Sequence, residues 1–359
     1  MRFHLKSALV LAVVFALNGC QTIGPGSVPR DRMEYAAVIG ESWKEQMLLN
    51  IVKLRYLDTP VFLDVSSIIS SYTLQSQVDI AAQAYPYSLP SASAQSNRRI
   101  GVSGTYTDRP TISYVPLTGE RLVNSLLRPI PPETIFALIS GGGRADFILR
   151  SAVQAINGIY NASTAPSRAR REDFRFIQVA EAFARIEEAG ALGMRIEKAG
   201  DRTRSFILFR QGMDDRVDQD TALVKEMLGL DPKADTFRLV FGASREHPDE
   251  ISLLTRSMQA LMGELSTGVD IPEQDLLDGR ATSRRAPSAN SGDAPLMGVH
   301  SGSERPPDAF AAVRYRNHWF WIDDRDLISK RMFRFLLMFS SMAESGALPQ
   351  GPLLTIPAR

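Results

Sequence analysis

Apolar residues recur at helical spacing in several stretches of the chain. Met47, Ile51 and Leu54 follow one another in this way after a segment of capping-box form that begins at Ser42. Because apolar residues at this spacing share one face of a helix, we expect a helix over residues 42–57. Similar patterns predict helices at residues 118–127, 131–139, 144–157, 174–189, 220–228, 251–265 and 330–342.

Other stretches have the composition or the alternation of strands. Residues 61–82 are rich in β-branched residues, Ser and Tyr, and residues 100–106 and 111–115 alternate apolar with polar positions. Turn-forming residues separate the last two segments, so we expect them to form a hairpin within one antiparallel sheet that also includes residues 61–82. Two more hairpins, 194–198 with 205–210 and 313–316 with 319–322, and an extended segment at 237–242 complete the predicted strands.

The order of these elements predicts the fold class. Helices and hairpins interleave without the β-α-β rhythm that a parallel sheet produces. We therefore expect an α+β fold, with small antiparallel sheets or hairpins packed against amphipathic helices, rather than a doubly wound α/β fold.

Changes in composition predict how the chain is divided. A stretch rich in Ser, Thr, Ala, Pro and Arg at residues 161–171 interrupts the periodic pattern. It predicts a boundary between an N-terminal α+β domain, residues 33–165, and a C-terminal α+β domain, residues 170–359. Polar residues 279–293 predict a mobile loop within the second domain. Repeated Gly and Pro over residues 20–32 predict a flexible tether ahead of the first domain.

Composition narrows the classes of function. The chain has 359 residues, with 41 Lys and Arg against 40 Asp and Glu, and a single cysteine. The length suffices for more than one domain with a buried core. Because the charges nearly cancel, no overall excess favours a nucleic-acid partner. One cysteine excludes an internal disulfide and Cys-rich zinc or iron–sulfur sites.

The beginning of the chain has the form of a secretory signal. Arg2 and Lys6 precede an apolar run that is about half as long as a membrane-spanning helix requires. The run ends in Leu-Asn-Gly-Cys at residues 17–20, and the whole segment closely resembles a bacterial lipoprotein signal. The resemblance implies a signal peptide over residues 1–19, cleavage after Gly19 and lipid attachment to Cys20.

Lipid attachment implies a location. Two or three acyl chains hold a protein durably on a membrane, because each buried CH₂ contributes about 0.8 kcal/mol. Gln21 follows the cysteine, whereas Asp at that position is the inner-membrane retention signal of enteric-type bacteria. The resemblance therefore implies a lipid-anchored protein of the bacterial cell envelope, in the outer membrane and facing the periplasm. Its partners would be membrane lipid, through acylated Cys20, and envelope proteins.

The body of the chain carries a second resemblance. Residues 43–64 and residues 314–330 resemble a group of uncharacterised proteobacterial lipoproteins. The resemblance extends over most of the mature chain. Because that group has no assigned activity, it implies a location and little else.

Three carboxylates form the densest local chemistry. Asp323, Asp324 and Asp326 follow a Trp-Phe-Trp segment, and carboxylates at this spacing could act as acid, base or metal ligand. The segment also fits a structural role, in which Trp319 and Trp321 pack the sheet against the last helix and Asp324 or Asp326 caps that helix. We expect the structural role and keep the carboxylates as a candidate site.

A second candidate is His247, which stands with acidic residues ahead of the helix predicted at 251–265. The cluster lacks the paired-histidine spacing of a metalloprotease, and acidic residues favour a helix N-terminus, so a capping role is expected. The glycines at 141–143 lack the spacing of a phosphate-binding loop and predict a turn between helices. No metal or cofactor is expected.

These observations support a non-enzymatic envelope lipoprotein with an accessory, scaffolding or binding role. The alternative is a membrane-tethered hydrolase acting on cell-wall or lipid material, with the Asp323–Asp326 carboxylates or His247 at its site. A module that binds a small ligand is a third possibility. Convergence of polar side chains in a pocket would favour either of the last two.

Overall fold

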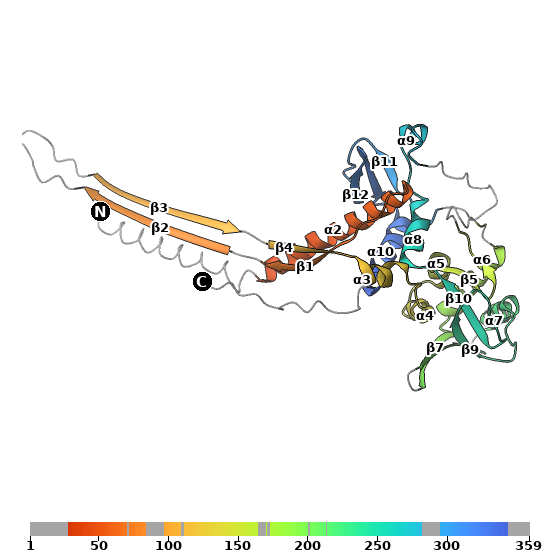
Figure 1. Ribbon diagram of the computed structural model, residues 1–359. Helices are drawn as coiled ribbons and strands as arrows, with labels where there is room; N and C mark the ends of the chain where they lie inside the picture. The colour runs from red at the N-terminus through yellow and green to blue at the C-terminus, as the bar shows by residue number, and fades with distance from the viewer. Residues whose placement is uncertain are drawn as a thin grey trace, which may run out of the picture. The chain divides into compact units, whose positions relative to one another are not determined.

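The structure, a computed structural model, describes residues 28–69, 72–83, 97–108, 111–163, 170, 173–199, 202–212, 214–281 and 295–343. Helices interleave with small antiparallel sheets and one larger sheet, which confirms the predicted α+β class (Figure 1). The described residues fall into two compact units. The first unit comprises residues 28–40 and 63–116, and the second comprises residues 41–62 and 117–343. The signal peptide with Gly19, and Cys20 after it, lie outside the described residues.

Helix α2, Val28–Arg55, begins well before the helix predicted at residues 42–57. Its early residues are largely exposed, and Met33 and Val38 are 71% and 66% exposed. An exposed helix needs no apolar stripe, so periodicity does not detect it. Pro29 lies in the first turn, where its missing N–H removes no helical hydrogen bond. The tether predicted at residues 20–32 is therefore helical from Val28 onward, and residues 20–27 lie outside the described residues.

The first unit contains two antiparallel strand pairs. Its strands are β1 (Leu63–Ile69), β2 (Tyr72–Gln83), β3 (Asn97–Asp108) and β4 (Thr111–Pro116). β1 pairs with β4, and β2 pairs with β3. From Ser67–Ser113 through Gln83–Asn97, the two residue numbers of every paired position have the same sum. The two strand pairs therefore follow one register. We call these four strands the ribbon (Figure 1).

The hairpin predicted between residues 100–106 and 111–115 is wrong. These segments belong to β3 and β4, which pair with β2 and β1 instead of with each other. Alternation identifies a strand but not its partner. β3 matches β2 over 12 residues, a longer ladder of hydrogen bonds than the 6-residue β4 could offer it. The predicted single sheet is accordingly two two-stranded pairs.

The second unit contains the remaining elements. Its helices, besides the end of α2, are α3 (Gly119–Leu122), the π-helix η3 (Val123–Leu127), α4 (Pro132–Ser140), α5 (Ala145–Ala152), α6 (Phe174–Glu188), α7 (Asp215–Leu228), α8 (Met258–Ser266), α9 (Glu273–Leu277) and α10 (Leu327–Ala343). Its strands are β5 (Val153–Ile156), β6 (Ile159–Tyr160), β7 (Leu192–Ala199), β8 (Arg202–Phe209), β9 (Thr236–Phe241), β10 (Glu250–Thr255), β11 (His300–Gly302), β12 (Ala309–Tyr315) and β13 (His318–Asp323).

The larger sheet has six strands in the order β6-β5-β10-β9-β8-β7. Neighbouring strands are antiparallel, except for the parallel pair β9 and β10. β7 and β8 form the hairpin predicted from residues 194–210. β5 and β6 precede the boundary predicted between residues 165 and 170, and the other four strands follow it. The sheet therefore joins the two sides of that boundary within one compact unit.

Two predicted helices are wrong over part of their length. The helix expected at residues 144–157 ends at Ala152, because the following residues form β5. Of the helix expected at residues 251–265, the first part is β10, and only α8 is helical. A short segment with closely spaced apolar residues, such as Ile251, Leu253 and Leu254, fits a buried strand as well as a buried helix. β10 lies inside the sheet and is buried at almost every position, so such a segment suits it.

Aromatic side chains connect the sheet to the helices that cover it. Phe136 of α4 contacts Phe183 of α6, with 5.8 Å between ring centroids. Phe183 contacts Phe209 of β8 at 5.9 Å, and Phe209 contacts Phe237 of β9 at 5.8 Å. All four side chains are almost completely buried. Contacts of this kind stabilise the core beyond the area that they bury.

The smaller sheet of this unit contains the third predicted hairpin, β12 and β13, with β11 added to β13. Arg316 and Asn317 at its turn both have positive φ, 45° and 67°, as a two-residue type I′ turn requires. Phe320 is completely buried, whereas Trp319 and Trp321 lie on the other face and are half-buried. The prediction that the two Trp side chains form the packed face is therefore wrong, because the alternate positions of the strand face the core.

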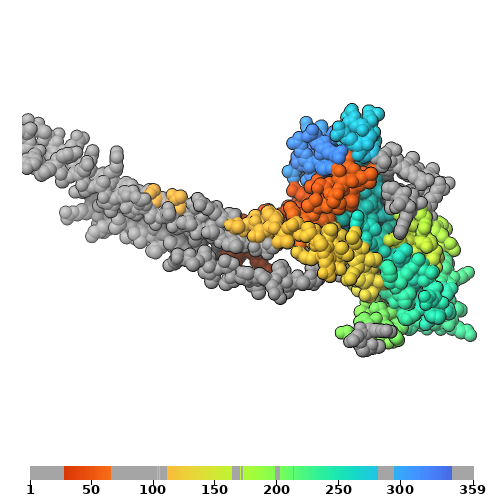
Figure 2. Space-filling model, in the orientation of Figure 1, coloured from red at the N-terminus to blue at the C-terminus, as the bar shows by residue number. Residues whose placement is uncertain are grey.

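The end of α2 packs against this smaller sheet. Lys44 donates a hydrogen bond from Nζ to the carbonyl of Phe310 in β12 at 3.2 Å, and its Nζ lies 4.6 Å from the centre of the Phe310 ring. Tyr56 contacts Phe320 edge to face, with 6.2 Å between ring centroids. Figure 2 shows the orange surface of α2 beside the blue surface of these strands.

We predict that Phe320→Ala lowers the free energy of unfolding by about 3–5 kcal/mol, because it leaves a cavity in the core. Trp321→Ala, one position along the same strand, removes a larger but half-exposed side chain and should cost clearly less. Urea unfolding followed by circular dichroism measures both. Equal losses for the two variants would contradict the assignment of the buried face.

Candidate functional site

Asp326 stands at the start of α10 and caps that helix. Its Oδ1 accepts hydrogen bonds from the backbone N–H groups of Ile328 and Ser329 at 3.1 and 3.0 Å. Its Oδ2 accepts one from the Ser329 hydroxyl at 2.5 Å. Burial raises the pKa of Asp326, but these donors and nearby His300 lower it by more, so the pKa is below its ordinary value. Asp326 thus has the capping role that the sequence predicted for Asp324 or Asp326.

The other two carboxylates have partners of their own. Asp323 accepts a hydrogen bond from the backbone N–H of Arg325 at 2.7 Å. The Asp324 carboxylate is exposed and forms an ion pair with Lys330, at 2.6 Å between Oδ1 and Nζ. The three side chains therefore support the junction between β13 and α10 in different ways.

His247 lies on the loop between β9 and β10 and is exposed. Its backbone N–H and that of Glu246 donate hydrogen bonds to Glu250 Oε2, at 3.3 and 3.0 Å. The Glu250 carboxylate is almost fully buried and also pairs with Arg238. Burial raises the pKa of Glu250, but Arg238 and the two amides lower it by more. The predicted helix-capping role of this cluster is wrong, because Glu250 begins a strand and holds the loop in place.

The sequence candidates thus stand on two separate parts of the second unit, the β9–β10 loop and the β13–α10 junction. Throughout the part of the chain that the structure describes, no group of three or more His, Cys, Asp or Glu side chains could hold a metal ion. Cys20 and Gly19, the predicted sites of lipidation and cleavage, lie outside that part.

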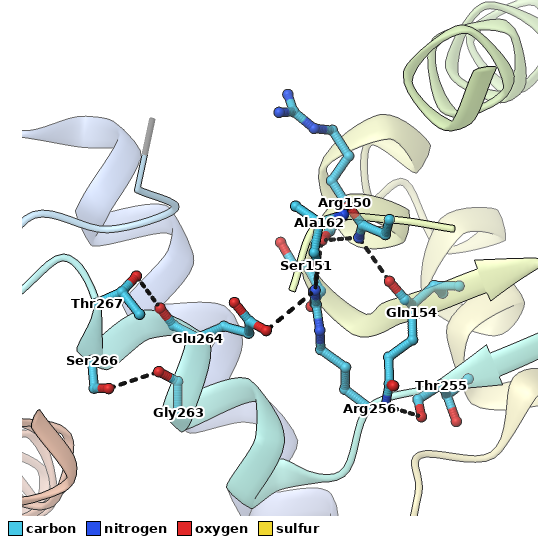
Figure 3. A network of polar contacts seen from close by, with 12 residues as sticks. Arg150, Ser151, Gln154, Ala162, Thr255, Arg256, Gly263, Glu264, Ser266 and Thr267 are labelled. Atoms are coloured by element: carbon cyan, nitrogen blue, oxygen red, sulfur yellow. Dashed lines mark hydrogen bonds and ion pairs between the residues drawn. The ribbon is translucent and has the colours of Figure 1, made fainter. Parts of the chain in front are cut away.

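A polar network that the sequence did not indicate surrounds Arg256, between β10 and α8 (Figure 3). The Arg256 side chain is 3% exposed and donates to the carbonyls of Arg150 and Ser151, at 2.9 and 2.6 Å, and to that of Ala162 at 2.6 Å. The first two carbonyls belong to the last turn of α5, where a helix leaves carbonyls without partners. Glu264 of α8 faces the guanidinium at 3.8 Å. One side chain therefore links α5, α8 and the chain after β6.

A second cluster forms at the end of α2. The Tyr56 hydroxyl donates to Asp275 Oδ2 of α9 at 2.6 Å, and both residues are buried. Tyr315 and Arg316, at the β12–β13 turn, both donate to Asp58. The Arg316 guanidinium also lies 4.9 Å from the centre of the Tyr56 ring. The cluster thereby connects α2, α9 and the smaller sheet.

The pKa values in this cluster favour a structural role. Burial and the hydrogen bond to Asp275 raise the pKa of Tyr56, and burial and Asp58 raise that of Tyr315. Both hydroxyls therefore stay protonated at neutral pH and donate hydrogen bonds instead of acting as bases. The bonded residues are 219 and 257 positions apart, so no local pattern could have indicated the cluster.

Within the described residues, no helix combines the length and the apolar character needed to span a membrane. A scan against protein-family models, a search of the curated proteins and a search of the solved structures found no match.

We predict that Asp326→Ala lowers the free energy of unfolding at neutral pH by about 1 kcal/mol, because the helix loses its cap. The folded-state pKa of Asp326 is lowered, so its stabilisation is present above the unfolded-state pKa of about 3.9 and disappears as pH falls through the folded-state value. The difference between wild type and variant should therefore shrink in acid. Denaturant unfolding at a series of pH values, with Asp324→Ala as the control, measures it, and a difference that is constant with pH would contradict the capping role.

We also predict that Arg256→Ala lowers the free energy of unfolding by about 3–5 kcal/mol, because the Ser151 and Ala162 carbonyls and the Glu264 carboxylate each lose a buried partner. Arg185→Ala is the matched control, since Arg185 pairs with Asp220 at 2.7 Å but is 51% exposed. That variant should lose only about 0–1 kcal/mol. Similar losses for the two variants, measured by urea unfolding, would show that Arg256 does not hold the unit together.

Proposed function

We propose that this chain is a lipid-anchored protein of the bacterial cell envelope with a non-enzymatic accessory or scaffolding role. The observation that carries the proposal is the sequence Leu-Asn-Gly-Cys at residues 17–20, after a basic start and a short apolar run. By its resemblance to lipoprotein signals, this segment would be removed up to Gly19, and acylated Cys20 would hold the mature chain at the periplasmic face of the outer membrane.

The distance along the chain from Cys20 to the first helix of the described residues supports an anchor close to the body. α2 begins at Val28, so only residues 21–27 separate the two. Even fully extended, that connection spans at most about 28 Å. The first turn of α2 would therefore stay near the membrane surface.

The contacts of the candidate residues support a scaffolding role over a tethered hydrolase. Both oxygens of the Asp326 carboxylate are engaged in capping α10, and the Glu250 carboxylate beside His247 is buried against Arg238. A hydrolase would need such groups directed at a substrate, with pKa values suited to proton transfer. Here the pKa values of Asp326 and Glu250 are lowered, which favours permanently charged structural carboxylates.

Mass spectrometry of the mature protein, purified from bacterial membranes, tests the anchor. We expect the mature chain to begin at Cys20 and to carry acyl chains. In Cys20→Ser, the lipoprotein route should not cleave the signal, and the protein should carry no acyl chain. Gln21→Ser, which changes the neighbouring residue and leaves the Leu-Asn-Gly-Cys segment intact, is the matched control and should be acylated. An unmodified Cys20 thiol in the membrane-purified protein would overturn the proposal.

A further inference from the structure

The ribbon of the first unit places apolar and polar residue types on different faces. Adjacent positions of a strand lie on opposite faces, and paired positions lie on the same face. In β2 and β3 the even-numbered positions therefore share one face, here called the apolar face, and the odd-numbered positions share the polar face. The polar face holds pairs such as Gln77–Ser103 and Gln75–Thr105. The apolar face holds Leu74, Val78, Ile80, Ile100, Val102 and Tyr106.

A bulge keeps the apolar face continuous into β1 and β4. There Ile68 pairs with Ile112, and Val65 pairs with Tyr114. The positions of β1 that lie on this face change from odd to even between Val65 and Ile68, and the register shifts at the same place, between Val65 and Ser67. A bulge accommodates one extra residue in a strand. Here it keeps Leu63, Val65 and Ile68 on one face, whereas Ile69, which pairs with Thr111, lies on the opposite face.

The β1–β4 part of this face is exposed where the structure describes its side chains on β4. Ile112 and Tyr114 are 41% and 56% exposed. A two-stranded ribbon is only marginally stable alone in water, and large exposed apolar areas mark sites of association. A partner that covers the apolar face would therefore stabilise the ribbon.

The position of charged and tyrosine residues fits a lipid surface. On the apolar face of β2 and β3, charged residues occur only at the two ends, where Arg98 pairs with Ala82 and Asp108 pairs with Tyr72. Between these ends, no residue on the apolar face is charged. Each strand is 12 residues long, which corresponds to about 40 Å. Tyr72 and Tyr106 lie towards one end of this uncharged stretch. Tyrosine and long cationic side chains are favoured at the boundary between acyl chains and water.

The edges of the ribbon indicate how it would lie. Among the described strands, β2 and β3 pair only with each other, so each has one edge of backbone N–H and C=O groups without a strand partner. Such groups are too costly in the hydrocarbon core but are satisfied by water and headgroups at its surface. A ribbon lying in the interface, with the apolar face towards acyl chains and the polar face towards water, satisfies both requirements.

We propose that the apolar face of the ribbon binds the acyl region of a lipid membrane as a second membrane contact, in addition to the lipid anchor. Residues 28–40, the part of α2 nearest in sequence to Cys20, belong to the same unit as the ribbon. Two membrane contacts on one unit hold a protein far more firmly than one. The second contact does not depend on acylation, so a protein without the anchor tests it separately.

The experiment is flotation of the mature chain with Cys20→Ser on phosphatidylcholine vesicles, which carry no net charge and isolate the apolar contribution. We expect the unacylated protein to float with the vesicles. Val78→Asp combined with Ile80→Asp should lower the vesicle-bound fraction at least about tenfold, because two charges replace apolar residues on the binding face. Gln77→Asp combined with Ala81→Asp adds the same charge to the polar face of the same strand and should leave flotation unchanged.

The outcomes separate the anchor from the ribbon. Failure of the Cys20→Ser protein to float, or equal flotation of the two double variants, would overturn the proposal while leaving the acylation of Cys20 to its own measurement. Sedimentation without vesicles distinguishes a second copy of the chain as the occupant. The Cys20→Ser protein could self-associate without floating on vesicles. If Val78→Asp combined with Ile80→Asp then abolishes the self-association, the proposal is also overturned.

A labelling experiment avoids reliance on charged variants that could unfold the ribbon. Cys20→Ser removes the single cysteine of the chain, so Val78→Cys or Gln77→Cys supplies a unique thiol for an environment-sensitive fluorophore. A quencher on the lipid acyl chains should quench the label at position 78 strongly and the label at position 77 weakly. Equal quenching at these neighbouring positions, or none at either, would contradict a membrane contact through the apolar face.

Discussion

The buried guanidinium of Arg256 is the constraint on which the second unit depends. A charge taken out of water is tolerated only if its donors find acceptors, and here the carbonyls at the end of α5 and after β6 provide them. The same contacts help to satisfy carbonyls at the end of α5, where the Arg150 carbonyl also accepts a hydrogen bond from Asn161. The Arg256 side chain thus holds α5 in one arrangement with β10, which precedes Arg256 in the chain, and with α8, which follows it (Figure 3).

The first unit follows the opposite principle. The second unit buries its aromatic residues in a closed core, as the chain from Phe136 to Phe237 shows. The ribbon instead separates apolar from polar positions on the two faces of a two-stranded layer, which cannot bury either face by itself. This difference is the physical basis for placing the stabilising contacts of the protein in the second unit and its proposed membrane contact in the first.

Several elements could be predicted because their signals are local. The β7–β8 and β12–β13 hairpins, α6 and the cap of α10 each depend on residues close together in the sequence. Predictions failed where burial or pairing decided. β10 has the apolar spacing expected of a helix but is an inner strand, and β3 and β4 pair with earlier strands. In β13, the buried face holds Phe320 and not Trp321. The Tyr56 and Arg256 clusters were missed because their partners are far apart in sequence.

By itself, the sequence determined the α+β class and most helix and strand positions, since these follow from spacing and short motifs. The anchor that we propose at Cys20 depends on a resemblance to lipoprotein signals, which is also a local feature of the sequence. Only the tertiary structure decided what the candidate residues do. It assigns Asp326 to the start of α10, His247 to an exposed loop and Glu250 to a buried pair with Arg238. It also decided that the two strand pairs of the ribbon share one register, with the large apolar residues of β2 and β3 on a common face. The reason is that pairing and burial depend on residues that folding, and not sequence proximity, brings together.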